Sequence, residues 1–224
     1  MCGRYTLTVP IEQVEKLFDV DQATEQDIPP RYNIAPTQNV PAVIENTDRK
    51  RQLRLFHWGL IPFWADDPAI GNRLINARIE GAAQKNAFKA AMKYRRCLIA
   101  ADGFFEWKKS ADGKQPLLFR RKDRRPFALA GLWETWKKAD QTVRSCTILT
   151  QEPNELVKPV HNRMPVVLPK DKWEKWLDVS LQDAAAAADL VEQWEADEFE
   201  AYPVTKQMNS PQFEDPKAVE PVDE

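Results

Sequence analysis

The chain has little cysteine and little histidine, and these shortages exclude whole classes of site. Three cysteines, an odd number with no close spacing, indicate neither a disulfide framework nor a zinc site and fit a reducing cytoplasm. The two histidines are far apart in the sequence, so we expect no metal and no organic cofactor. These residues are Cys2, Cys97, Cys146, His57 and His161.

Long apolar runs and flexible linkers are also missing. No run approaches the roughly 20 residues that a membrane-spanning helix needs, and the first residues lack the basic and then apolar pattern of a secretory signal. We therefore expect a cytoplasmic protein without a membrane partner. No internal repeat or Gly/Ser-rich linker divides the sequence, so we expect one domain over residues 1–224, and a monomer.

The charge is nearly balanced overall but unevenly distributed. The net charge is −2, yet residues 180–224 hold 12 acidic and only 2 basic side chains. The remaining 30 basic and 22 acidic side chains give residues 1–179 a net charge of +8. A basic body is compatible with phosphate binding on one face. Prolines close the acidic end, where we expect an irregular tail from about residue 205.

The apolar pattern predicts many strands with interspersed helices. They do not follow the regular strand–helix alternation of a parallel sheet. We therefore expect an α+β fold, a single domain with a mainly antiparallel sheet or irregular barrel and flanking helices. Residues 110–113, Ser-Ala-Asp-Gly, predict a hairpin turn. Strands are expected near residues 42–44, 53–58, 74–80, 97–101, 104–108, 116–121, 127–132, 143–150 and 165–168, and helices near 8–18, 82–95, 170–178 and 181–194, with a short one from Pro153.

The most distinctive feature is a cysteine at the second position. Removal of Met1 by a methionine aminopeptidase, which accepts a small second residue, would leave Cys2 with an α-amine and a thiol on adjacent carbons. An α-amine has a pKa of about 7.7–8.0 and a free thiol one of about 8.5, which positive charge such as that of Arg4 is expected to lower. Such a 1,2-aminothiol either attacks an acyl carbon or condenses with an aldehyde to a thiazolidine ring. Chance occurrence of the cysteine is the alternative.

Other short segments combine polar and apolar residues in ways that are unusual for a core. Glu106 lies among large apolar residues, and burial would raise the pKa of its carboxyl group, as an acid/base catalyst requires. An outward-facing glutamate on an amphipathic strand is the alternative. His161 lies in a loop constrained by prolines. Asn76, Arg78 and Glu80 share one face of a predicted strand, which is either a water-facing edge or the wall of a site.

Residues 58–64 place aromatic side chains around Gly and Pro, which predicts at least one ring on a loop. Exposed rings beside cations suit single-stranded nucleic acid, since bases stack on rings without sequence preference. Rings folded back on the core are the alternative.

Six segments, in this order, closely resemble the SRAP family, the SOS-response-associated peptidase-like proteins that process abasic sites. The resemblance spans residues 2 to about 211 and therefore nearly the whole chain. The segments are Met1–Tyr5, Arg31–Pro36, Trp58–Pro62, Asn76–Glu80, Gly103–Trp107 and His161–Pro165.

The resemblance implies covalent capture of abasic sites in single-stranded DNA, in the DNA damage response and at the nucleoid during repair. The α-amine of Cys2 would form a Schiff base with the C1′ aldehyde, and the thiol would close a thiazolidine. Asn76 would orient the aldehyde, Glu106 would move protons near the amine, and His161 would be an acid/base at the sugar oxygen. The DNA-binding residues that the resemblance implies are Arg4, Asn33, Phe63, Trp64 and Arg78.

Two local departures from the family pattern affect DNA binding rather than crosslinking. Relatives often have two adjacent tryptophans where this chain has Phe63 and Trp64. They also often have a basic residue near Asn86, a charge that Lys85 or Lys89 would replace. DNA affinity or junction preference is therefore expected to differ.

Three other functions stay open. A Cys2-dependent peptidase or N-terminal-nucleophile amidohydrolase would use the thiol on an amide carbon, and the peptidase would fit autoproteolytic removal of a leader. A lyase would cut the DNA through the Schiff base. A non-catalytic DNA-binding module would not need the cysteine, so Cys2→Ala would leave its activity intact.

Overall fold

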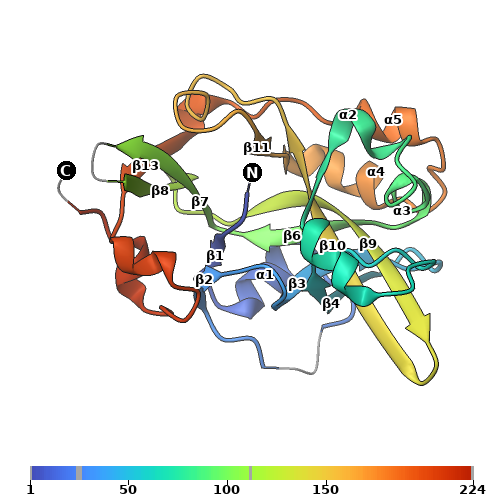
Figure 1. Ribbon diagram of the computed structural model, residues 1–224. Coiled ribbons are helices and arrows are strands. Elements are labelled where there is room, and N and C mark those ends of the chain that lie inside the picture. The colour runs from blue at the N-terminus through green and yellow to red at the C-terminus, as the bar shows by residue number, and fades with distance from the viewer. Residues whose placement is uncertain (1, 24–26, 111–112, 223–224) are drawn as a thin grey trace.

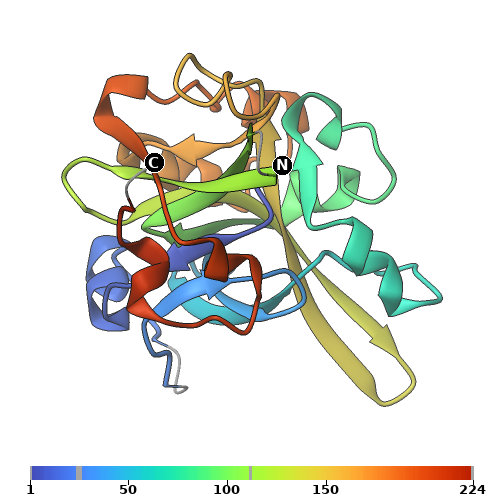
Figure 2. The ribbon, with the colours of Figure 1, turned by 60° about the vertical axis from the view of Figure 1, so that its left-hand side comes forward.

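The computed structural model describes residues 2–23, 27–110 and 113–222. Figure 1 shows two β-sheets with short helices around them. The expected class, α+β with mainly antiparallel pairing, is confirmed. Figure 2 shows the C-terminal segment lying across the front of the strands.

The first sheet contains the start of the chain. Its strand order is β13-β8-β7-β1-β2, and every pair is antiparallel. Asp102 holds β1 in place, since its carboxylate accepts hydrogen bonds from the Thr6 hydroxyl at 2.5 Å and the Thr8 N–H at 2.6 Å. The strands are β1 (Tyr5–Leu7), β2 (Arg31–Ile34), β7 (Gly103–Ser110), β8 (Gly113–Arg121) and β13 (Phe199–Pro203).

Five strands of the second, eight-stranded sheet close into a barrel. Strands β10, β4, β3, β6 and β9 are neighbours in that order, and β9 also pairs with β10. All six residues of β6 are buried, which explains the apolar run that follows Arg96. The pairs β10–β4 and β10–β5 are parallel. The strands are β3 (Asn39–Glu45), β4 (Arg51–Trp58), β5 (Asn76–Arg78), β6 (Arg96–Ala101), β9 (Phe127–Lys138), β10 (Gln141–Gln151), β11 (Met164–Pro165) and β12 (Val167–Leu168).

Each strand range expected from the sequence overlaps an observed strand. The prediction did not include the short strands β1, β2 and β13. Strands β7 and β8 pair as far as Ser110 and Gly113, as a hairpin requires. The other two residues of the expected turn, Ala111 and Asp112, lie outside the described residues.

The helices are shorter than the sequence predicts. The helix expected over 82–95 is divided, because Phe88 turns into the core and is only 4% exposed. The helix expected over 181–194 ends at Ala188, because Leu190 and Trp194 are buried. From Pro153 the chain forms hydrogen-bonded turns instead of a helix. The α-helices are α1 (Ile11–Leu17), α2 (Ile79–Ala82), α3 (Lys89–Tyr94), α4 (Trp173–Leu177) and α5 (Ala184–Ala188), and 3₁₀-helices cover Pro68–Arg73, Lys170–Lys172, Ala196–Glu198, Lys206–Asn209 and Pro216–Val219.

Residues 204–222, where the sequence predicts an irregular acidic tail, pack against the first sheet. Val204, Met208 and Ala218 are buried and form a small apolar cluster with Phe105 and Leu118. This segment therefore lies beside the strand that carries Glu106, and it includes two of the 3₁₀-helices.

Candidate functional site

The N-terminal segment runs beside β7 and brings Cys2 to Glu106. Tyr5 pairs with Phe104, and the Phe105 N–H donates to the Arg4 carbonyl at 2.9 Å. Continuing this antiparallel register places Cys2 beside the strand residues just after Phe105. Figure 1 shows the start of the chain between strands β7 and β8 on one side and helix α2 on the other.

Burial determines the state of the Cys2 thiol. The residue is 0% exposed, and its Sγ lies 4.0 Å from the Arg4 carbonyl oxygen. Burial, followed by the charge of Glu106, raises the pKa of the thiol far above its ordinary value. The expectation that the charge of Arg4 gives the thiol a lowered pKa is wrong: the hydrogen bond to the Arg4 carbonyl lowers this pKa, but by less than burial raises it. The Arg4 guanidinium instead donates to the Asn33 side chain at 2.8 Å and to the Met208 carbonyl at 3.0 Å.

Glu106 has the environment that the sequence predicts. Its side chain comes from the middle of β7, opposite Leu117, and the residue is 2% exposed. Burial raises the pKa of the carboxyl group above its ordinary value. A carboxyl group with a raised pKa is a suitable proton acceptor and donor for the neighbouring cysteine.

Asn76 connects the second sheet to the N-terminal segment. Its Nδ2 donates to the Cys2 carbonyl oxygen at 2.8 Å. Its Oδ1 is buried and accepts no hydrogen bond from any residue that the structure describes. A buried acceptor without a donor is costly, so this oxygen has an unmet hydrogen-bonding requirement beside Cys2.

His161 follows a run of tight turns and is held by its own loop. Nδ1 lies 3.0 Å from the Arg163 backbone nitrogen and 3.2 Å from the Arg163 carbonyl oxygen, so this one residue provides both a donor and an acceptor for the ring nitrogen. Burial lowers the pKa of the imidazole, which favours the neutral form of the ring. The Arg163 guanidinium pairs with both Glu80 oxygens, at 2.9 and 2.8 Å, and donates to the Thr150 carbonyl at 2.6 Å. This double pairing fixes the loop against β10 and α2.

Glu106 and His161 line the same pocket, which has a volume of about 800 Å³. Its other walls come from the β7–β8 hairpin, the turn before His161 and the C-terminal segment. The other lining residues are Trp107, Lys108, Lys109, Lys114, Pro159, Val160 and Asn209.

The predicted DNA-binding residues differ in exposure. Asn33 is 0% exposed, and its Nδ2 donates to three carbonyls of the C-terminal segment, those of Met208, Ser210 and Phe213. In this conformation its side chain presents no surface to a ligand. Arg4 is half-buried beside Asn33, whereas Arg78 is exposed on β5.

Phe63 and Trp64 lie on an anchored loop with their rings exposed. They are 57% and 49% exposed, which excludes the alternative of rings folded back on the core. Gly59 and Gly71 meet at the base of the loop. A Cβ on Gly59, whose φ is +133°, would lie 2.7 Å from the Gly71 carbonyl oxygen. This approach allows no side chain at Gly59.

The structure adds residues that the sequence analysis did not assign to the site. Asn209 reaches the pocket from the C-terminal segment, and its Oδ1 accepts a hydrogen bond from Trp107 Nε1 at 2.7 Å. Nothing in the local sequence around Asn209 indicates this position, because it depends on a contact between residues 102 positions apart. The lysines of the β7–β8 hairpin that line the pocket were not predicted from the sequence.

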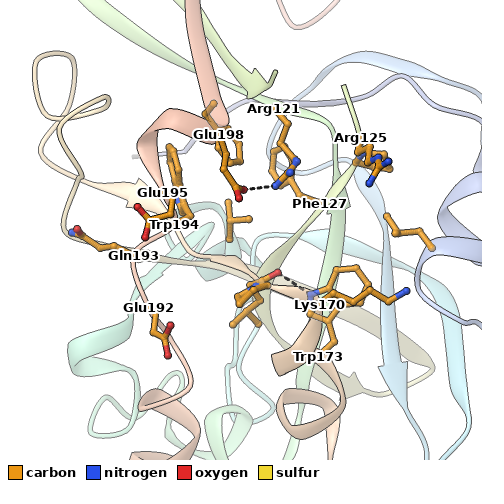
Figure 3. Close-up of a pocket in the computed structure, with 16 residues that line it drawn as sticks. Arg121, Arg125, Phe127, Lys170, Trp173, Glu192, Gln193, Trp194, Glu195 and Glu198 are labelled. Atoms are coloured by element: carbon orange, nitrogen blue, oxygen red, sulfur yellow. Dashed lines mark hydrogen bonds and ion pairs between the residues drawn. The ribbon is translucent and has the colours of Figure 1, made fainter. Parts of the chain in front are cut away.

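A second pocket, of about 310 Å³, shares no lining residue with the first. Figure 3 shows its mixed lining of apolar and charged side chains and the ion pair between Arg121 and Glu198, whose atoms are 2.7 Å apart. It contains none of the predicted site residues. Among the described residues, no group of three or more His, Cys, Asp or Glu side chains is arranged to hold a metal ion. No helix within residues 2–23, 27–110 and 113–222 has the length and apolar character needed to cross a membrane.

Comparison with known proteins gives consistent matches along the whole chain. The sequence model of the SOS response associated peptidase (SRAP) family matches residues 1–211. Abasic site processing protein YoqW of Bacillus subtilis (strain 168) is 38% identical over 223 residues, which cover 98% of this chain and 99% of the relative. Abasic site processing protein YedK of Escherichia coli (strain K12) is 31% identical over 232 residues, covering 99% and 100%. A crystal structure of a protein from Bacteroides thetaiotaomicron superposes with a TM-score of 0.84 at 25% identity, covering 99% and 100%.

Proposed function

This chain belongs to the SOS response associated peptidase (SRAP) family, and we propose that it processes abasic sites in single-stranded DNA by forming a crosslink through Cys2. Relatives of matching length carry the name abasic site processing protein. The observation that carries the proposal is the meeting of Cys2 with buried Glu106 and Asn76 beside the 800 Å³ pocket. In this proposal one protein monomer acts on one abasic site, at the nucleoid.

The proposed reaction requires Cys2 as the first residue. The opened abasic sugar presents an aldehyde at C1′. The α-amine of Cys2 adds to this carbon, and loss of one water gives a C=N Schiff base. The thiol then adds across the C=N bond, so that sulfur bonds to C1′, nitrogen gains a proton and a thiazolidine ring closes. The atoms balance without an oxidant or a reductant.

The raised pKa of the thiol favours this sequence of steps over attack on an amide. A thiol with a raised pKa is protonated at neutral pH and is a poor first nucleophile. The amine would act first, and Glu106 would take the thiol proton once the Schiff base is in place. The same carboxyl group would return the proton when the ring reopens.

His161 and Asn76 would act on the sugar. His161 lines the pocket, and its imidazole would donate a proton to the ring oxygen as the sugar opens. The buried Oδ1 of Asn76 would accept a hydrogen bond from a sugar hydroxyl while its Nδ2 stays on the Cys2 carbonyl. A Schiff base also acidifies the C2′ proton, so strand cleavage by β-elimination is the expected side reaction.

Arg78 and the rings of Phe63 and Trp64 would bind the flanking DNA. Arg78 is exposed for a phosphate, and the two rings are exposed for stacking with bases. Arg4 would approach a phosphate only at the edge of the site, and Asn33 would contribute by holding Arg4 and the C-terminal segment.

Incubation of the processed protein with an oligonucleotide carrying one abasic site tests the proposal. We expect a 1:1 adduct that survives denaturing electrophoresis and whose intact mass shows the loss of one water. Cys2→Ala and a form that retains Met1 should give none, while Cys146→Ala, which removes another buried cysteine, should give the adduct.

Absence of the adduct with correctly processed protein would reject the proposal. Amide substrates would then test the peptidase or amidohydrolase alternative. An adduct that persists in Cys2→Ala would instead show that a stable bond forms without the thiol, because this variant keeps the α-amine.

A further inference from the structure

We infer that Lys108, Lys109 and Lys114 form a phosphate-binding arm, which grips the DNA backbone on the side of the abasic nucleotide opposite Arg78. The inference rests on the proposed function and extends it to the path of the strand. These three residues are called the lysine arm below. All three are exposed and line the pocket that contains Glu106 and His161.

The register of the first sheet places the lysine arm directly beyond Cys2. Because β1 and β7 are antiparallel, residues before Tyr5 lie alongside residues after Phe104. The alignment brings Cys2 level with the residues that precede Lys108 and Lys109. With a rise of about 3.3 Å per residue in a strand, the lysines lie within one or two residues of the proposed crosslinking atom. A DNA strand joined to Cys2 would have its neighbouring phosphates within reach of them.

The arm carries like charges that its own hairpin brings together. Lys109 and Lys114 are direct cross-strand partners, and Lys108 lies one residue away. Like charges directly opposite one another destabilise an antiparallel pair. Among the described residues, no acidic side chain forms an ion pair with any of the three, whereas Lys138 pairs with Asp66 at 3.5 Å. A polyanion would relieve this repulsion.

Arg78 lies on the other side of the N-terminal segment. It follows Asn76 on β5, directly before α2, and Figure 1 shows α2 and the β7–β8 strands on opposite sides of the start of the chain. The exposed rings of Phe63 and Trp64 lie on the same side as Arg78. Their loop begins at the end of β4, and its Leu60 N–H donates a hydrogen bond to the Leu74 carbonyl, close to the start of β5. A strand that crosses Cys2 therefore meets stacking rings and Arg78 on one flank and the lysine arm on the other.

Lysines are suited to this task because an ammonium group recognises a phosphate as a point charge and does not select among bases. Each phosphate contact adds to the salt dependence of binding, with a slope of about 0.7 per contact for single strands. The inference therefore predicts that the lysine arm contributes to the salt dependence of DNA binding, which side chains with a purely structural role would not do.

The first experiment compares salt slopes of equilibrium binding to single-stranded DNA, in the Cys2→Ala background to prevent crosslinking. The triple variant K108Q/K109Q/K114Q should lower the slope of log K against log salt by about 2. Between 50 and 200 mM salt, the affinity of the parent should then fall roughly 20-fold more than that of the variant. The control is K16Q/K50Q/K175Q, which removes the same charge from three exposed lysines that line neither pocket and should keep the parent slope.

The second experiment uses two oligonucleotides, with the abasic site at the 5′ end or at the 3′ end, so that DNA extends to one side only. The lysine-arm variant should weaken binding to one of them and Arg78→Gln binding to the other. An unchanged salt slope would overturn the assignment to DNA and leave an acidic protein segment as the partner that the arm fits. Equal losses on both oligonucleotides would overturn the opposed arrangement. Failure of the parent protein to form any adduct would reject the proposed function, a result separate from these slopes.

Discussion

At the scale of single residues, burial determines the chemistry of this site more than sequence neighbours do. Cys2 has an arginine two positions away, yet the pKa of its thiol is raised, because desolvation and Glu106 outweigh a guanidinium that is bound elsewhere. Desolvation by burial is also the main reason that the pKa of Glu106 is raised. A raised pKa makes the Glu106 carboxylate a stronger base than an ordinary glutamate, so in its ionised form it is better able to take the proton that the Cys2 thiol carries.

Replacing Glu106 should reveal this burial as a pH-dependent stability difference. Because the folded-state pKa is raised, the folded state favours the protonated carboxyl. The stabilisation that comes from this preference is complete below about pH 4.3, the pKa of a glutamate in the unfolded chain. It is lost as the pH rises through the pKa of Glu106 in the folded state. Glu106→Gln cannot ionise, so its free energy of unfolding should increase relative to the parent protein from about pH 4.3 upward.

Urea unfolding of both proteins from pH 4 to pH 8 measures this difference. Glu106→Asp keeps an ionisable group on the same strand and should lack the upward trend. A constant difference between Glu106→Gln and the parent across this range would contradict a raised pKa.

At the scale of elements, the long β9–β10 ribbon supports the loop that carries the exposed rings. Trp136 on β9 is 3% exposed, packs with Ile61 and Ala65, and its Nε1 donates to the Ala65 carbonyl at 2.7 Å. Lys138 Nζ donates to the Asp66 carbonyl at 2.7 Å. The loop thus has two fixed points directly after Phe63 and Trp64, which leaves the rings exposed on a rigid base.

Trp136→Phe should loosen this loop while leaving the fold intact. An aromatic ring is kept, although phenyl is smaller than indole. One buried hydrogen bond worth about 1 kcal/mol is lost, and the Ala65 carbonyl is left without its donor. Amide hydrogen exchange of residues 60–73, followed by mass spectrometry, should become faster. Trp133→Phe is the matched control, since Trp133 lies on the same strand and packs on Phe56. Equal exchange in both variants would show that the bond does not hold the loop.

Helices show the limit of local prediction at this scale. The helix predicted over residues 181–194 contains α5, whose five consecutive alanines favour a helix. The structure adds Asp183 as its N-cap, with the carboxylate accepting from the Ala185 N–H at 2.9 Å. The end of the helix was misplaced, because the buried position of Trp194 against Phe199 and Phe104 requires the chain to turn. Most helical stability comes from tertiary packing, so boundaries follow the core rather than the propensity.

At the scale of the whole molecule, the C-terminal segment completes a site that begins at the other end of the chain. Asn33 joins the two, with its Nδ2 on three carbonyls of residues 208–213 and its Oδ1 on Arg4. Asn209, placed by this segment, lines the pocket and bonds to Trp107. The pocket therefore depends on residues separated by almost the full length of the sequence.

Asn33→Ala should release the C-terminal segment. Loss of the three donated bonds and of the bond from Arg4 should lower the free energy of unfolding by about 2–4 kcal/mol. Limited proteolysis should cut between residues 204 and 222 before the rest of the chain, and the yield of the abasic-site adduct should fall with it. Asn39→Ala, which changes an exposed asparagine at the start of β3, is the control and should match the parent. A protected segment in Asn33→Ala would show that its apolar cluster holds it alone.

The sequence by itself determined the strands of the barrel, the α+β class and the cluster of chemistry-bearing residues. These features depend on local patterns: continuous apolar runs, a second-position cysteine, and a glutamate or histidine in a distinctive short segment. The resemblance to a known family extended this to named roles for Cys2, Asn76, Glu106 and His161, which remain predictions.

Only the tertiary structure decided which of these groups meet and in what state. It buried the Cys2 thiol and thereby raised its pKa, enclosed Asn33 and brought Asn209 into the pocket. Desolvation and cross-strand contact depend on atoms that come from distant parts of the chain. No local pattern contains that information, because the energy of a charge or a polar group is set by its three-dimensional surroundings.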